Sequence, residues 1–240
     1  FALGYSPETW DAFTKEAFDK LYPGYGSSYI NFYGGAGFLF EQGSSRGHVQ
    51  ETSTVPITFA FTIRNQFTAS IATIRASLGE KASLLKLRKE FYRVANEQAK
   101  KSLVKAYVFG DPNDFTRTRA FLDLLLLHEI DVYETSGPVS ADGKKFEAGK
   151  AYMVPVDQPN YIMVRSVFEK AITYIDSTFY DASTWSLIHA YGLPYGEVKV
   201  PLTPGKKLTA APVSAPGTVA KSGYAYVLEA SDYNVHKAIY

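Results

Sequence analysis

The chain has 240 residues, of which 46% are hydrophobic, 20% are charged and 15% are aromatic. This hydrophobic fraction is typical of a packed globular protein, and the length predicts one or two domains. With 25 basic and 24 acidic residues the net charge is +1, so no nucleic-acid partner and no anionic membrane surface is expected. The chain has no cysteine, which excludes disulfides, thiolate metal ligands and a cysteine nucleophile.

The two ends of the sequence predict a piece of a longer protein. The chain begins at Phe1 without an initiator methionine or the pattern of a signal peptide. It ends at Tyr240, inside an apolar-periodic stretch that has no capping residue. No apolar run reaches the roughly 18 residues that a membrane-spanning helix needs, so we expect no membrane span.

The first hundred residues alternate between helical and strand-like patterns. Apolar periodicity and capping residues predict helices over residues 6–20, 65–78 and 81–101. Short apolar runs predict strands over residues 37–41 and 55–63.

The pattern changes in the middle of the chain. Residues 105–110 predict a strand, which is followed by a turn, a helix and a second strand over residues 130–134. This β-α-β order predicts parallel strands in an open α/β sheet. The dipeptide Asp142-Gly143 predicts the turn of a hairpin within residues 138–152.

The last third predicts one more strand and helix, a linker and a repeat. The strand and the helix are expected at residues 152–156 and 159–174. Residues 201–223 hold four prolines among small residues and lysines, which is typical of an exposed linker or insertion. Residues 225–240 are similar to residues 106–121, which predicts a second strand-turn-helix start. Two unrelated βα units that share common residue types would explain the similarity equally well.

Glu41 is the most suggestive single residue. It ends the apolar run G-F-L-F, and catalytic sites in open α/β sheets form just beyond the carboxyl ends of strands. Apolar neighbours raise the pKa of a carboxylate, which suits a general base near neutral pH. The alternative is a carboxylate that pairs with Arg46 or caps the following loop.

Several blocks of the sequence together resemble a known family. They are Y-P-G-Y-G-S-S-Y at residues 22–29, F-L-F-E ending at Glu41, F-T-I-R-N-Q-F at residues 61–67, V-P-V-D-Q-P at residues 154–159 and F-Y-D-A-S-T-W at residues 179–185. They are similar to the C-terminal half of the carboxypeptidase A-like zinc carboxypeptidases. The similarity is to a bacterial branch whose peptidase domain is followed by a domain similar to class I glutamine amidotransferases.

The resemblance implies roles for individual residues. Glu41 matches the glutamate that activates the zinc-bound water and passes its proton to the leaving amine. Tyr22 matches the mobile tyrosine of the family because it stands in a Y-x-x-x-G-S setting, and Tyr25 is its close competitor. Arg46 suits the terminal carboxylate of a substrate by its geometry, although a surface salt bridge explains it as well. The implied substrates are peptide or protein C-termini, and the implied location is secreted or periplasmic.

The zinc ligands of the family are an H-x-x-E pair and a later histidine, all preceding the catalytic glutamate. The first histidine of this chain is His48, so the implied ligands lie upstream and the chain alone is expected to be inactive. His48 and Glu51 form an H-x-x-E pair of their own, with His128 or His189 as a third ligand. This pair follows Glu41 and a Gly/Ser loop, so a solvated loop is the preferred interpretation.

The expected fold class is α/β in two parts. Residues 1–104 are expected to be the C-terminal part of a zinc-carboxypeptidase α/β domain. Residues 105–240 are expected to be an open, flavodoxin-like domain similar to class I amidotransferases, cut off at its end and carrying the linker at residues 201–223. Without a cysteine, amidotransferase chemistry is not expected of this second part, and an accessory or docking domain is the preferred interpretation. The alternative function is a catalytically inert module that binds peptide or glycan through the tyrosine-rich loop.

Overall fold

A computed structural model describes residues 23–24, 26–38, 40, 43, 45–170, 186–214, 218, 221, 223–227 and 230–238. The chain divides into two compact units, Phe1–Arg93 and Val94–Tyr240. This division falls inside the long helix α3 (Lys81–Lys101), ahead of the boundary expected between residues 104 and 105.

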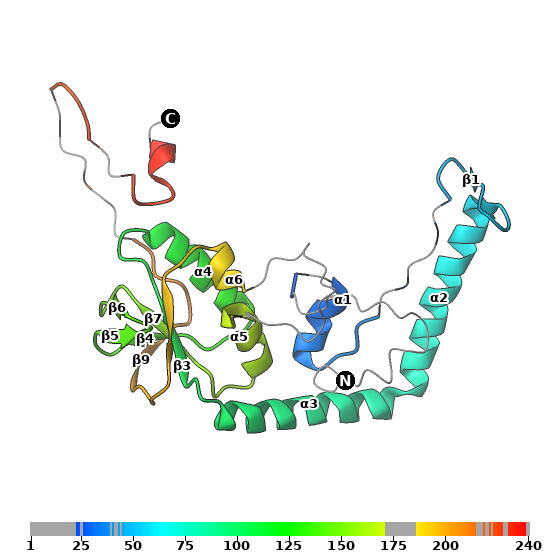
Figure 1. Ribbon diagram of the computed structural model, residues 1–240, viewed down its shortest axis with the longest axis horizontal. Coiled ribbons are helices and arrows are strands. Elements are labelled where there is room, and N and C mark those ends of the chain that lie inside the picture. The colour runs from blue at the N-terminus through cyan, green and yellow to red at the C-terminus, as the bar shows by residue number, and fades with distance from the viewer. Residues whose placement is uncertain are drawn as a thin grey trace. The chain divides into compact units, whose positions relative to one another are not determined.

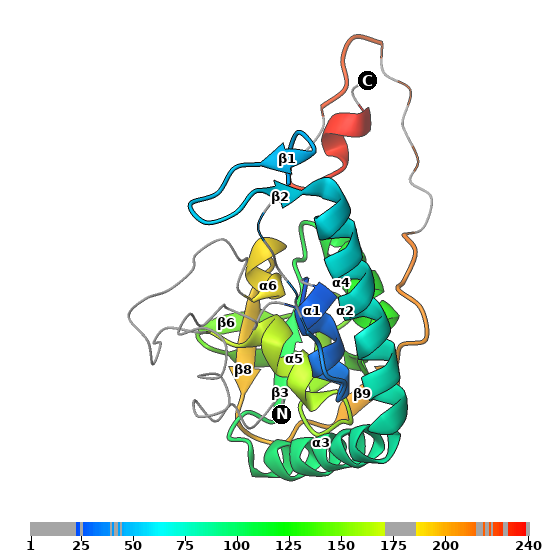
Figure 2. The same ribbon diagram turned by 90° about the vertical axis from the view of Figure 1, so that its right-hand side faces the viewer.

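The first unit consists of short elements followed by long helices (Figures 1 and 2). Its elements before α3 are α1 (Gly26–Tyr29), the 3-10 helix η2 (Ile30–Tyr33), β1 (Val49–Gln50), β2 (Ile57–Thr58) and α2 (Phe59–Gly79). Strands β1 and β2 form a small antiparallel pair directly before α2. Gly34 ends η2 with a φ of 72°, a left-handed conformation that favours glycine.

Two strands expected in the first unit are wrong for the described residues. The run 55–63 forms a strand only at β2, because the hydroxyl of Thr58 accepts a hydrogen bond of 3.2 Å from the N–H of Phe61 and caps a helix there. Helix α2 therefore begins six residues before the expected start at residue 65. In the expected strand 37–41, the described residues Gly37, Phe38 and Phe40 belong to no strand. Leu39, Glu41 and the expected helix 6–20 lie outside the described residues.

The second unit is built around a five-stranded sheet with the order β8-β3-β7-β4-β9. The strands are β3 (Ala106–Phe109), β4 (Tyr133–Thr135), β7 (Tyr152–Pro155), β8 (Tyr195–Val198) and β9 (Pro204–Lys207). Every neighbouring pair is antiparallel. The expected parallel pairing is therefore wrong: β3 and β4 run in the same direction, but β7 lies between them and pairs with both. The fold is mixed α/β with an antiparallel sheet.

Each face of this sheet is covered by a different layer (Figure 1). Helices α4 (Phe115–Leu127), α5 (Tyr161–Phe168) and α6 (Leu187–Ala190) cover one face, and the hairpin of β5 (Val139–Ala141) and β6 (Lys144–Phe146) covers the other. The alternation of side chains along β3 explains this arrangement. Phe109 points to the helices, with its ring centroid 5.1 Å from that of Phe121. Val108 belongs to a buried cluster with Ala141 and Phe146 of the hairpin.

The hairpin prediction at Asp142-Gly143 is confirmed. Ala141 pairs with Lys144, so the loop has two residues, and both have positive φ angles of 48° and 73°. Two consecutive positive φ angles define the type I′ turn, which is the reason for the Asp-Gly preference.

The linker expected at residues 201–223 is wrong at its start, because β9 lies within it. The first residue of β9, Pro204, pairs with Thr135 at the edge of the sheet. Proline has no N–H to donate, and an edge position tolerates this because the strand has a neighbour on one side only. The second strand-turn-helix start is not formed by the described residues: Ala225–Val227 belong to no strand, and only the 3-10 helix η3 (Val235–Ala238) follows. Among the described residues, no helix has both the length and the hydropathy of a membrane span.

Candidate functional site

The residues with the strongest predicted roles, Glu41, Tyr22 and Tyr25, lie outside the residues that the structure describes. Their roles as general base and substrate contacts stay predictions.

Three further predicted residues lie around β1 in the first unit, and all are exposed. Arg46 and His48 belong to the turn before the strand, and Glu51 follows it. His48 has a φ of 74°, its N–H donates to the carbonyl of Ser45 at 3.2 Å, and its carbonyl accepts from the N–H of Phe59 at 2.8 Å. The backbone conformation at His48 is therefore fixed by the turn.

Metal ligation by His48 and Glu51 has no support from the described residues. Within them, no group of three or more His, Asp or Glu side chains could hold a metal ion. Two exposed ligands do not make a zinc site, which takes at least three protein ligands. The residues that the structure describes therefore do not fit zinc.

The carboxyl end of β3 leads into α4 through a tightly built turn. Gly110 has a φ of 148°, and a Cβ at this position would lie 2.4 Å from the carbonyl oxygen of Lys150, so only glycine fits. Asp111 closes an Asx turn by accepting from the N–H of Asn113 at 2.9 Å. Asp114 then caps α4 by accepting from the N–H of Arg117 at 2.9 Å.

Arg117 balances the negative charges of both carboxylates in this turn. Its Nε lies 3.0 Å from Oδ2 of Asp114, and its Nη2 lies 3.4 Å from Oδ2 of Asp111. The side chain of Asp114 is only 4% exposed, so its charge needs this partner. The turn between β3 and α4 is thus held by ion pairs.

Asp232 reaches this turn from the C-terminal end of the chain. Its Oδ2 accepts from the N–H of Thr116 at 3.1 Å, and its Oδ1 accepts from the N–H of Asn234 at 2.9 Å. The side-chain amide of Asn234 donates to the hydroxyl of Thr116 at 3.3 Å. The N–H of Thr116 is one of the donors that a helix leaves unpaired at its start, so Asp232 supplies what α4 itself cannot.

The contacts of Asp232 change its ionisation. Desolvation raises its pKa, but the hydrogen bonds from Asn234 and Thr116 outweigh that effect, and the charge of Arg117 acts in the same direction. The net pKa lies below the ordinary value of 3.8, so Asp232 is ionised at neutral pH.

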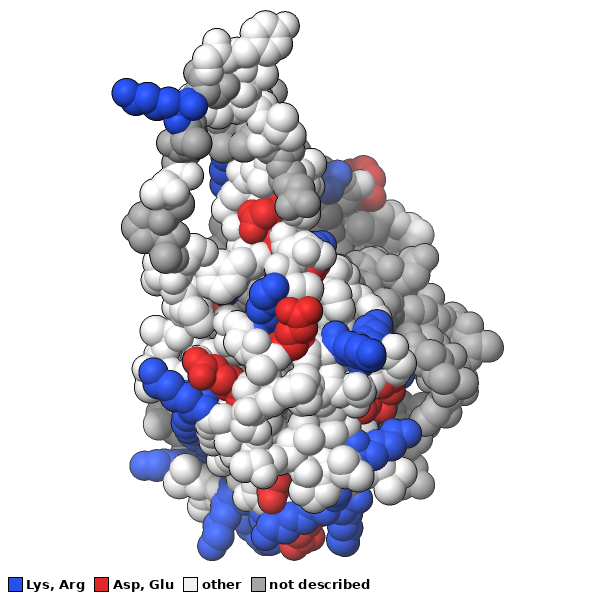
Figure 3. All heavy atoms as spheres, turned by 90° about the vertical axis from the view of Figure 1, so that its left-hand side faces the viewer, with Lys and Arg blue, Asp and Glu red and all other residues white. Residues whose placement is uncertain are grey.

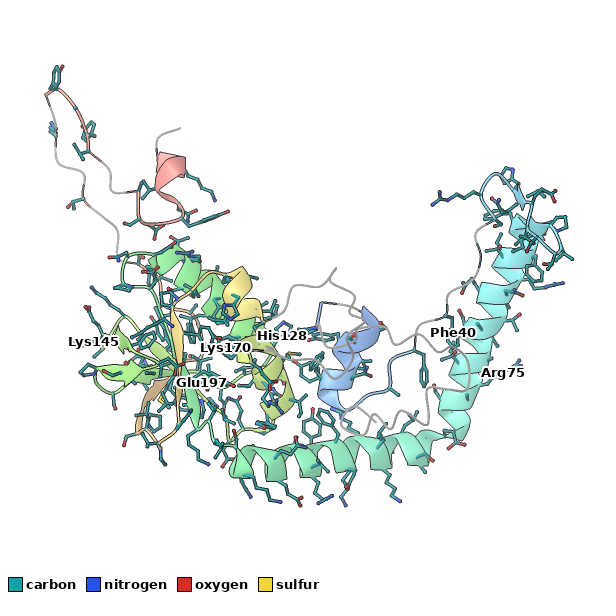
Figure 4. The ribbon with its side chains drawn as sticks, in the orientation of Figure 1. Phe40, Arg75, His128, Lys145, Lys170 and Glu197 are labelled. Carbon is teal, nitrogen blue, oxygen red and sulfur yellow. The ribbon has the colours of Figure 1, made fainter. Side chains whose placement is uncertain are left out.

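Tyr195 and His189 form a second polar cluster that the sequence did not indicate. The hydroxyl of Tyr195 lies 3.1 Å from Nε2 of His189. Lys170, labelled in Figure 4, places its Nζ 5.1 Å from the centroid of the Tyr195 ring, and Lys144 donates from Nζ to the Tyr195 carbonyl at 2.9 Å. No motif or periodicity links these residues, which come from α6, β8, β6 and the segment after α5.

This cluster keeps the phenol of Tyr195 protonated. Burial, and then the negative charges of Glu197 and Asp142, raise its pKa to about 12. A phenol with this pKa is no general base at neutral pH. Since β8 is an edge strand, we interpret the cluster as a cover for that edge of the sheet.

His128 has a structural role at the end of α4. It is the C-cap residue, labelled in Figure 4, and the side chain of Asn160 donates to its carbonyl at 3.2 Å. Burial lowers the pKa of its imidazole, so the ring is mainly neutral near pH 7.

The face of the molecule that carries the β5–β6 hairpin shows no large field of one sign in its described part. Lys and Arg side chains alternate there with Asp and Glu side chains (Figure 3). An alternating surface of this kind gives no long-range attraction for a polyanion.

No protein family model, no curated protein and no solved structure matches this chain. The resemblance to zinc carboxypeptidases therefore depends on the sequence blocks alone.

Proposed function

We propose that the chain is part of a bacterial, secreted or periplasmic zinc metallocarboxypeptidase that hydrolyses the C-terminal bond of peptides or proteins. The observation that carries the proposal is the block of residues 22–47, in which the sequence F-L-F-E follows a Y-x-x-x-G-S segment at a spacing similar to that of the family. Residues 1–104 would be the C-terminal part of the peptidase domain.

The exposure of α2 supports the view that the first unit belongs to a larger domain. None of its 21 residues is buried, although it carries a series of large apolar side chains. Those that are exposed are Phe59, Phe61, Ile63, Phe67, Ile74 and Leu78. A helix of this composition normally covers a sheet or other helices. A further part of the domain, packed on α2, would supply that cover.

In the proposed reaction Glu41 acts twice. It first accepts a proton from the attacking water and then gives that proton to the leaving amine, so the protein ends the cycle unchanged. Tyr22 or Tyr25 would donate a hydrogen bond to the scissile amide or to the terminal carboxylate of the substrate, and Arg46 would pair with that carboxylate. Zinc ligands would have to come from upstream of this chain.

The second unit would be the accessory domain similar to class I amidotransferases. Its sheet departs from the open parallel sheet of such folds, since both neighbours of β3 are antiparallel to it. The proposal therefore includes a rearranged sheet, and it assigns no hydrolytic chemistry to this unit because the chain has no cysteine.

The second candidate function is a binding module without catalysis. It is favoured by exposed aromatic side chains next to the predicted site, since Phe38 and Phe40 are both more than half exposed. Exposed aromatic side chains are typical anchors for peptide or sugar ligands. In this function Tyr22 and Tyr25 would contact the ligand, and Glu41 would have no part in chemistry.

The substitution Glu41→Gln in the intact protein separates the two candidates. The peptidase proposal predicts that kcat falls about a hundredfold or more while zinc content is unchanged, because only proton transfer is removed. Glu51→Gln is the matched control, and it should leave the rate unchanged. A Glu41→Gln protein that keeps its peptidase rate would remove Glu41 from the mechanism, and a wild-type protein without peptidase activity would favour the binding module.

A further inference from the structure

Strand β8 is an outer strand of the five-stranded sheet, with β3 as its neighbour. In an antiparallel pair, the backbone groups of alternate residues point toward the neighbouring strand and away from it. The carbonyl of Pro194 accepts from the N–H of Gly110 at 3.2 Å, so Tyr195 and Glu197 direct their N–H and C=O groups away from β3. Outward groups of this kind are those that a further strand would bind.

The tip of the β5–β6 hairpin takes the place of such a strand. Asp142 lies in the two-residue turn, and its Oδ2 accepts from the outward N–H of Glu197 at 3.0 Å. Lys144 follows the turn, and its Nζ donates to the outward carbonyl of Tyr195 at 2.9 Å. One side chain thus supplies the acceptor, and the other the donor, that a neighbouring strand would supply at these positions.

The close approach of the hairpin tip depends on Gly196. A Cβ at Gly196 would lie 2.7 Å from the Cβ of Ala141 and 2.9 Å from the carbonyl oxygen of Ala141. A larger residue would therefore push the tip away from β8 and lengthen both hydrogen bonds. Glycine at this position lets the tip lie directly on the strand.

Lys170 holds the carboxylate of Asp142 at this edge. Its Nζ lies 3.7 Å from Oδ2 of Asp142, the oxygen that also accepts from Glu197, and 5.1 Å from the centroid of the Tyr195 ring. Lys170 and Glu197 are both labelled in Figure 4. The positive charges of Lys144 and Lys170 thus stand beside the paired backbone groups, and lysines at a sheet edge oppose pairing with another strand.

The other outer strand, β9, is protected in a different way. It begins with Pro204, ends with Lys206 and Lys207, and shifts its register against β4. Proline, lysine and irregular register all keep an edge strand from pairing. The four residues of β8 include no proline and no lysine, so its protection has to come from outside the strand.

We propose that the tip of the β5–β6 hairpin is an edge cap, formed by Asp142 and Lys144, that prevents β8 from pairing with β8 of a second copy of the chain. Two uncapped β8 strands would be complementary, because antiparallel strands related by a two-fold axis exchange their N–H and C=O groups. The edge cap therefore limits the sheet to one chain. It lies within the second unit and does not depend on the proposed peptidase function.

The double substitution Asp142→Gly and Lys144→Met removes both bonding groups and keeps the hairpin. Glycine adopts the positive φ of the turn, and methionine keeps an unbranched apolar side chain. Every chain compared also carries Phe67→Ser, Ile74→Ser and Leu78→Ser, so that association through α2 does not contribute. Over a roughly fiftyfold range of concentration, the mass of the double variant by light scattering should rise from one chain to two, whereas the capped chain stays monomeric.

Hydrogen exchange at the amide of Glu197 shows whether β8 is the strand that pairs. At low concentration this amide should exchange about tenfold faster in the double variant, because its bond to a carboxylate is lost. At high concentration it should become protected, because a second β8 replaces the edge cap. Amides of β3 are the standard for a folded sheet, and Asp142→Gly alone should give a smaller change in the same direction.

Lys145→Met is the matched control, since Lys145 is the exposed neighbour of Lys144 on the same hairpin (Figure 4). Asp142→Asn is the conservative variant and should stay monomeric, because its side-chain oxygen still accepts from Glu197. A double variant that stays monomeric, or that associates without protection of the Glu197 amide, would overturn the edge cap. Equal association of the Lys145→Met chain would overturn it as well.

Discussion

Strand β3 and helix α2 are both apolar segments, but their environments are opposite. All four residues of β3 are buried between the helices and the hairpin of the second unit. None of the 21 residues of α2 is buried. Apolar composition thus predicts that a segment can pack against other elements, whereas its burial depends on whether such elements are present.

The largest expected difference between the two regions is in the cost of removing a phenylalanine. Phe121→Ala removes a fully buried ring that meets Phe109 and Phe168 edge-to-face. We expect the free energy of unfolding of the second unit to fall by about 3–5 kcal/mol. Phe67→Ala on α2 should change the free energy of unfolding by less than about 0.5 kcal/mol. Urea titrations followed by circular dichroism measure both free-energy changes. Similar losses of stability in the two variants would contradict the difference between β3 and α2.

A smaller loss of stability is expected at alkaline pH in the second unit, which contains β3. The pKa of Tyr195 is raised from 10.0 to about 12, so above pH 10 the unfolded chain loses this proton while the folded chain keeps it. The stability that Tyr195 contributes is therefore complete below pH 10 and is lost as pH rises through 12.

Tyr195→Phe should make the alkaline decline in stability less steep. Some decline should remain, because burial also raises the pKa of Tyr107. Unfolding titrations at a series of pH values from 8 to 12 would measure the change, and an identical pH profile in the variant would exclude a raised pKa at Tyr195.

Substitutions on α2 are expected to have the smallest effect on stability but a measurable effect on self-association. Exposed apolar side chains promote association, so the 240-residue chain should self-associate at high concentration. Replacing Phe67, Ile74 and Leu78 together by Ser should reduce the mass measured by light scattering and leave the second unit equally stable. A strictly monomeric wild-type chain would show that the apolar face of α2 is tolerated in water. Arg75, which projects outward from α2 (Figure 4), offers Arg75→Ala as a control that keeps the apolar side chains.

Local patterns predicted some of this fold because their causes are local. The bounds of α3 match the expectation at residues 81–101, since its apolar and charged positions repeat at helical spacing. The Asp142-Gly143 turn was predicted for the same kind of reason. The start of α2 was missed because its N-cap, Thr58, lies inside an apolar run that favours a strand.

Long-range features could not be predicted from the sequence. The insertion of β7 between β3 and β4 depends on which strands find each other, and a β-α-β order alone does not specify it. In the same way, Asp232 and Thr116 are 116 positions apart, and no pattern joins them. The turn from Asp111 to Asp114 was visible as a polar D-P-N-D segment, but its pairing with Arg117 was not.

The most direct test of the proposed function is the zinc content per chain, measured by elemental analysis on the intact protein and on the 240-residue chain. The account predicts about one zinc in the intact protein and none in the 240-residue chain, because catalytic zinc needs three protein ligands. Stoichiometric zinc in the 240-residue chain would contradict it and would point to His48 and Glu51. An intact protein without zinc would also contradict it and would leave the binding module as the function.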